Sequence, residues 1–136
     1  MTEDLVILKL NEIWECDIPF GWIPITGDKK ILNTEIYQSR HFDENILNLA
    51  ELLKSVYNVT ELFEVEEGGR VTLKNSADCY FSYTGLEHLY TDKDFRFVIY
   101  FSHESSVTVG GKDLLNFIRN NWPDYKNHIW TSPFYD

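Results

Sequence analysis

This chain of 136 residues has few cysteines, few basic residues and no long apolar run. The two cysteines, Cys16 and Cys79, are too few for a framework of disulfide bonds and are expected to be free thiols. Only twelve Lys and Arg face 22 Asp and Glu, and the formal net charge of −10 opposes binding to nucleic acids and anionic membranes. No stretch is long enough to span a membrane, and no signal peptide is expected at the acidic start. We therefore expect a cytoplasmic protein with no nucleic-acid and no membrane partner.

Sequence motifs of catalysis and of metal binding are also missing. The four histidines show none of the spacings, with one another or with the cysteines, that mark a metal site. The nucleophile motif Gly-x-Ser-x-Gly is absent, and the glycine pairs at 68–69 and 110–111 lack the flanking residues of a phosphate-binding loop. Ser102 and His103 are adjacent, but neighbours on a strand point to opposite faces, so no catalytic dyad is expected. The sequence predicts no enzyme, no metal and no cofactor, although a site assembled from distant residues stays open.

The apolar content, in contrast, is ample for a folded core. Hydrophobic residues make up 43% of the chain and aromatic residues 15%. This length and composition suit one globular domain over residues 1–136, which can bury a core without disulfides or metal.

Hydrophobic periodicity predicts the secondary structure. Apolar residues at helical spacing predict one helix over about 44–57, with Asp43 as its N-cap, and a second over about 112–121. Consecutive strands with short connections mean an antiparallel sheet. We therefore expect an α+β fold: an antiparallel sheet of about five strands, with two helices packed mainly on one face. The expected strands lie at 5–10, 61–66, 70–74, 79–83, 95–101 and 107–109.

Two parts of this sheet can be placed more closely. A three-residue loop at 67–69 would pair Val65 with Val71 and place apolar residues opposite one another, whereas a two-residue turn would pair Glu66 with Val71. The apolar pattern therefore favours the longer loop. In the strand over 95–101, alternate residues share one face, which should be core. These residues are Phe95, Phe97, Ile99 and Phe101.

Acidic residues concentrate in one segment, which is the first candidate for a binding surface. Residues 43–67 hold seven acids and one base, Lys54. The inward positions of the predicted helix and strand are apolar, so the acids between them should face solvent. Trp22, in the Pro- and Gly-punctuated aromatic loop 14–26, is the candidate anchor, or else a tryptophan folded into its own core. The acidic candidates are Glu44, Glu51, Glu61, Glu64, Glu66 and Glu67.

These observations favour a small, acidic, non-enzymatic protein-binding domain. Such a surface suits a basic protein partner, and one class built this way is the bacterial immunity or inhibitor protein that neutralises a basic, nuclease-like toxin or a nucleic-acid-binding target. One alternative is a small enzyme or ligand-binding domain with a pocket between sheet and helices. Another is a homodimer that associates through the aromatic loop.

Overall fold

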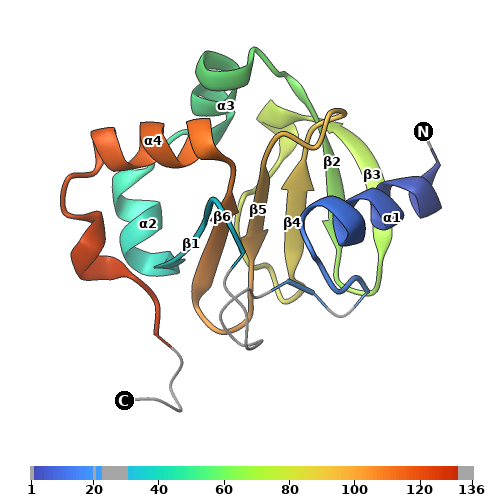
Figure 1. The fold of residues 1–136 in the computed structure, drawn as a ribbon, viewed down its shortest axis with the longest axis horizontal. Helices are drawn as coiled ribbons and strands as arrows, with labels where there is room; N and C mark the ends of the chain where they lie inside the picture. Colours follow the sequence, from blue (N-terminus) through green and yellow to red (C-terminus); the bar gives the residue numbers. More distant parts are fainter. Residues whose placement is uncertain (1, 20, 23–30, 132–136) are drawn as a thin grey trace.

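The computed structural model describes residues 2–19, 21–22 and 31–131. Within them the chain forms one antiparallel sheet of six strands, in the order β1-β6-β5-β4-β2-β3, and four α-helices (Figure 1). The strands are β1 (Thr34–Gln38), β2 (Glu61–Glu66), β3 (Arg70–Asn75), β4 (His88–Thr91), β5 (Val98–Phe101) and β6 (Ser106–Gly110). The helices are α1 (Glu3–Ile13), α2 (Ser39–Asn45), α3 (Leu49–Tyr57) and α4 (Lys112–Asn121), with short 3-10 helices η1 (Ser76–Asp78) and η2 (Tyr125–His128). The predicted α+β fold with an antiparallel sheet is confirmed. None of the described helices is long and apolar enough to cross a membrane.

The core has two layers, one on each face of the sheet. Helices α2, α3 and α4 pack against one face and α1 against the other. Side chains alternate along a strand, so β2 serves both layers: Leu62 lies in the first, and Phe63 and Val65 lie in the second. Both faces of the central strands are therefore covered.

The predicted hairpin has the predicted register. Val65 is paired with Val71, and Glu66 with Arg70. The loop closes through a hydrogen bond from the Gly69 N–H to the Glu66 carbonyl at 2.8 Å. Gly68 and Gly69 both have a φ of +96°, a region in which a side chain would be strained. The apolar pattern and the glycine pair thus agree on this turn.

The strand expected over 95–101 is confirmed only in part. Pairing with the neighbouring strands begins at Val98, where β5 meets β4 and β6. Phe97, Ile99 and Phe101 lie in the core layer under α2–α4, as predicted. Phe95 lies in the opposite layer, because its φ of 56° turns the chain before the strand begins. The short strand β6 pairs back onto β5, and α4 spans the predicted residues.

The expectation of a strand over 5–10 is wrong, since these residues belong to α1. The Thr2 hydroxyl caps the helix by accepting a hydrogen bond from the Leu5 N–H, and two acids occupy the first turn, where the helix dipole favours negative charge. Val6 and Leu10, four residues apart, are fully buried. A continuous aliphatic run does not distinguish a strand from a helix, and here the cap and the four-residue spacing decide.

Two further expectations are corrected around residues 44–83. The single helix over 44–57 is two helices, α2 and α3, separated at 46–48, and the N-cap of α3 is Asn48 rather than Asp43. The strand expected over 79–83 is an irregular turn after η1, in which Phe81 has a φ of 51°. These two departures from regular structure lie opposite each other and shape the site described next.

Candidate functional site

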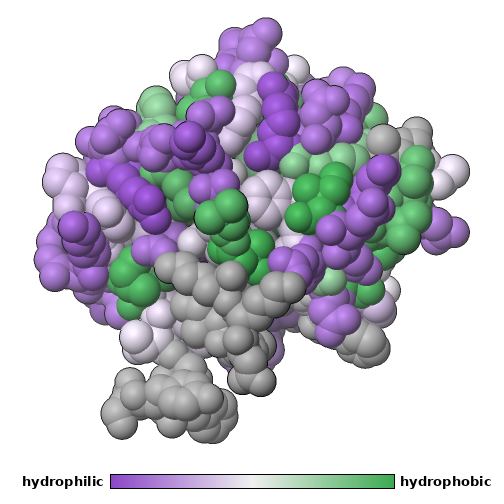
Figure 2. Space-filling view, in the orientation of Figure 1, coloured by the Kyte–Doolittle hydropathy of each residue, from purple (hydrophilic) through white to green (hydrophobic). Residues whose placement is uncertain are grey.

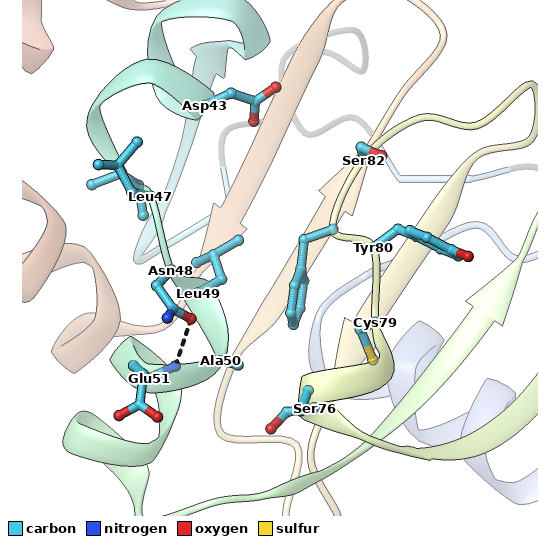
Figure 3. Close-up of a pocket in the computed structure, with 13 residues that line it drawn as sticks. Asp43, Leu47, Asn48, Leu49, Ala50, Glu51, Ser76, Cys79, Tyr80 and Ser82 are labelled. Atoms are coloured by element: carbon cyan, nitrogen blue, oxygen red, sulfur yellow. Dashed lines mark hydrogen bonds between the residues drawn. The ribbon is translucent and has the colours of Figure 1, made fainter.

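A groove of about 550 Å³ opens between the α2–α3 junction and the segment that follows β3 (Figure 3). In this view the side chain of Asp43 points from the first wall towards the second, whereas the ring of Tyr80 points away from the first wall. The lining residues are Asp43, Ile46, Leu47, Asn48, Leu49, Ala50, Glu51, Ser76, Ala77, Cys79, Tyr80, Phe81 and Ser82.

The first wall exists because the helical chain breaks at residues 46–48. Ile46 leaves the helical conformation, with φ −112° and ψ 84°. The Asn48 side chain then accepts a hydrogen bond from the Glu51 N–H at 3.2 Å, which starts α3. The break leaves Leu47 with 84% of its surface exposed.

The second wall is held by local hydrogen bonds after β3. The Asn75 side chain accepts from the Ala77 N–H at 3.0 Å, and the Cys79 N–H donates to the Ser76 carbonyl at 3.2 Å. Burial raises the pKa of the Cys79 thiol to about 11, so the thiol is protonated at neutral pH and is not a nucleophile there.

The groove is acidic and has an apolar rim. Its lining includes the carboxylates of Asp43 and Glu51 and no Lys, Arg or His. Asp43 is an exposed residue, but partial burial of its carboxylate raises its pKa, and a cation placed beside it would stabilise the charged form. Leu47 and Tyr80, which are 84% and 79% exposed, place apolar surface at the edge of the groove. A positively charged group flanked by apolar groups would match this surface.

The predicted acidic residues do not form one continuous surface. Glu44 and Glu51 are exposed beside the α2–α3 junction, next to Asp43. Glu61 is exposed at the start of β2, 3.6 Å from the Lys93 ammonium. The remaining predicted acids, Glu64, Glu66 and Glu67, lie further along β2 and in the turn after it, where only Glu67 is exposed.

Glu64 contradicts the expectation that it faces solvent, since only 2% of its surface is exposed. It lies on the sheet face that α2–α4 cover, where the Lys74 ammonium is 2.8 Å from Oε1 and the His88 Nδ1 is 3.7 Å from Oε2. Burial raises the pKa of Glu64, but hydrogen bonds from Lys74 and Tyr90 outweigh it, and the net pKa lies below the usual value. The buried carboxylate is therefore ionised and paired. Strand alternation did not reveal this, because both faces of β2 are covered.

Trp22 is buried, with 3% of its surface exposed, and packs in the layer under α1. Its indole N–H donates to the Trp14 carbonyl at 2.8 Å, and the two rings meet edge to face at 6.2 Å. The second interpretation, a tryptophan folded into its own core, therefore describes its position.

A carboxylate–histidine pair, Glu87 and His103, lies where β4 begins and β5 ends. The Glu87 carboxylate is buried and accepts hydrogen bonds from the Tyr100 hydroxyl and the His103 N–H, and it lies 2.7 Å from the His103 Nδ1. The bond to Glu87 raises the pKa of His103. Ser102 does not join this pair, because its hydroxyl bonds to the Ser106 hydroxyl at 2.6 Å, in line with the expectation of no dyad. The cavity beside Glu87 measures about 20 Å³, and the contacts of Glu87 with the backbone and ring of His103 fix the loop after β5.

An exposed apolar surface also lies over α1. Figure 2 shows hydrophobic side chains gathered over this helix, at the right of the view. The exposed ones include Leu5, Leu8 and Ile13, with Leu8 57% exposed.

Of the predicted site residues, only Glu51 lines the groove, and the sequence did not indicate its other lining residues. One signal of the helix break was available in the sequence: Asn48 is a favourable N-cap residue, so a new helix could begin after it. The pairing of Glu64 with Lys74 and His88 carried no local signal, because these residues come from three strands and β4 was not predicted.

Comparison of the chain with protein-family models, curated proteins and solved structures finds no match.

Proposed function

We propose that this protein binds a basic segment of another protein in the groove between the α2–α3 junction and residues 76–82. The observation that carries the proposal is a groove of about 550 Å³ that is lined by acids without bases and rimmed by two exposed apolar side chains. Apolar surface that borders a hollow and is flanked by charged groups is one form that a protein-binding site takes.

Each part of the groove has a distinct role in this proposal. Leu47 and Tyr80 contribute affinity, since a partner that covers them removes their exposed apolar surface from water. Asp43 and Glu51 orient the basic side chains of the partner. The net charge of −10 speeds the encounter with a basic partner more than it strengthens the complex.

The biological role that we propose for this binding is neutralisation. Proteins that act on nucleic acids carry basic surfaces, and an acidic protein that covers such a surface blocks it. We therefore propose that the chain acts as an immunity or inhibitor protein directed against a basic, nuclease-like toxin. The alternative is that the groove binds a small ligand. Such a ligand would not need to contact the apolar side chains of Leu47 and Tyr80 at the rim.

The test is an NMR titration of the isotope-labelled protein with a short peptide in which lysines and arginines flank one leucine and one aromatic residue. We expect chemical-shift changes concentrated at residues 43–51 and 76–82, and none with a peptide whose basic residues are replaced by glutamine. Binding of free arginine amide as strong as that of the peptide would favour the small-ligand alternative. Shift changes spread evenly over all acidic surfaces, or no binding, would contradict the proposal.

Substitutions at the two rim residues test whether the groove is the peptide-binding site. Leu47→Ala and Tyr80→Ala should each weaken peptide binding about tenfold, the result of losing roughly 1.4 kcal/mol of contact energy. Leu32→Ala is the matched control, because Leu32 is 82% exposed and does not line the groove. Equal losses in the control and the rim variants, measured by isothermal titration calorimetry, would show that the groove is not the binding site.

A further inference from the structure

We propose that Glu64, Glu66 and His88 form a binding site for a divalent transition-metal ion of the zinc class. The three side chains each offer one donor atom, and these atoms lie within 4.8 Å of one another. The sheet brings them together: Glu64 and Glu66 are alternate residues of β2, and Glu66 pairs directly with His88 of β4. Alternate and directly opposed residues share one face of a sheet, so the grouping follows from the backbone register.

The observation that points to a ligand is the imidazole of His88. Only 6% of this residue is exposed, and its Nδ1 has no hydrogen-bond partner within the described part of the chain. Buried polar atoms in folded proteins are almost always paired, and this one faces the Glu64 Oε2 at 3.7 Å. A metal ion between the imidazole and the carboxylates would satisfy it.

The other ring nitrogen is already placed as a metal-binding histidine requires. Nε2 lies 2.7 Å from the Thr84 hydroxyl. When Nδ1 holds a metal, Nε2 carries the proton and donates it to that oxygen, an arrangement that fixes the ring and recurs around metal sites. Thr84 is thus a positioning residue for the proposed site.

Lys74 is the competitor for this ion. Its ammonium lies 2.8 Å from the Glu64 Oε1 and leaves Oε2 on the side of His88. The Lys74 side chain is 32% exposed and can turn towards solvent when a second cation arrives. In the absence of a metal, the Lys74 ammonium neutralises the buried Glu64 carboxylate. When a metal binds, the ion and Lys74 either share that carboxylate or Lys74 turns away from it.

The donor set selects the class of metal. One imidazole nitrogen and two carboxylate oxygens suit Zn²⁺ and its neighbours in the first transition row, whereas Ca²⁺ and Mg²⁺ prefer oxygen ligands alone. Three protein donors leave one position of a tetrahedral site for water.

The test uses the full chain, purified without an affinity tag and stripped of metal, titrated with Zn²⁺ by calorimetry and with Co²⁺ by visible absorption. We expect one equivalent to bind, and His88→Gln and Glu66→Gln each to weaken binding at least tenfold. Lys74→Gln should tighten it, because the competing charge is removed. Circular dichroism shows whether each variant is folded; Glu66 is only half-buried, so its variant tests the proposal even if His88→Gln misfolds.

His128→Gln is the matched control. His128 is stacked on His41 and lies beside the Asp124 carboxylate, so it could bind metal adventitiously at the surface. Full binding in this variant supports the buried site. Loss of binding in it, unchanged binding in His88→Gln and Glu66→Gln, or no binding of Zn²⁺ to the unmodified protein would overturn the proposal.

Discussion

At the scale of single residues, the environment of a side chain depends on what covers it. Glu64 was expected to face solvent because alternation gave the inward positions of β2 to Phe63 and Val65. Those two residues do face a core layer, but so does Glu64, since the opposite face of the sheet is covered as well. Periodicity separates the two faces of a strand, but it does not show whether the face opposite the apolar one is exposed to solvent or covered by a second layer. Reversing the charge of Glu64 would therefore disturb the fold before it tested any binding surface.

This burial predicts a pH-dependent contribution to stability. The folded pKa of Glu64 is lowered from its ordinary value of 4.5, so its ion pair stabilises the fold above that value and the contribution is lost as pH falls through the folded pKa. Glu64→Gln should cost about 1–3 kcal/mol at neutral pH, the penalty for a buried charged partner left unpaired. The cost is limited because Lys74 can reach solvent.

Urea denaturation at neutral and acid pH measures the effect. The difference in unfolding free energy between Glu64→Gln and the unmodified protein should shrink as the pH falls below about 4.5. The control is Glu61→Gln, at an exposed position where the change should stay within about 0.5 kcal/mol. A constant difference at every pH would show that the carboxylate does not act through its charge.

At the scale of elements, the sequence predicts best where several local signals agree. The β2–β3 hairpin combines apolar alternation with two glycines, and α4 combines an amphipathic pattern with Pro123 beyond its end. Helix α1 offered only an aliphatic run, which both helices and strands can contain. The break at 46–48 was hidden because apolar residues on both sides of it keep helical spacing, so the groove that depends on this break could not be predicted.

The N-cap of α3 gives a direct test of that break. Asn48→Ala should destabilise the protein by about 1 kcal/mol, because the Glu51 N–H loses its partner. Asp43→Ala, at the position predicted from sequence, should cost no cap energy, since Asp43 lies inside α2. Thermal unfolding of the two variants compares them, and an equal loss in both would argue for one continuous helix over 44–57.

At the scale of the whole molecule, the two core layers make the central strands the most protected part of the protein. All of β4, β5 and β6 is buried. The sequence indicated the amount of apolar surface and the fold class, but not the second layer, because the residues of α1 were assigned to a strand.

Phe97→Ala measures how much that core contributes. Phe97 is fully buried and its ring stacks on Tyr57 at 5.0 Å, so its truncation should cost ~3–5 kcal/mol. Tyr83→Ala, at a side chain that is 46% exposed, should change stability by less than about 0.5 kcal/mol. A shift in the urea midpoint no larger for Phe97→Ala than for the control would show that Phe97 is not in the core.

The strand order has a consequence for the growing polypeptide. Among the strands in the described part of the chain, β1 pairs with β6, where Thr34 meets Gly110 and Gln38 meets Ser106. During synthesis the hairpin of β2 and β3 can close as soon as it leaves the ribosome, whereas β1 must wait until residues 106–110 have emerged. Until then the backbone of β1 is an open template for neighbouring chains. Translation that stalls before residue 106 therefore leaves a fragment prone to aggregation rather than a smaller folded protein.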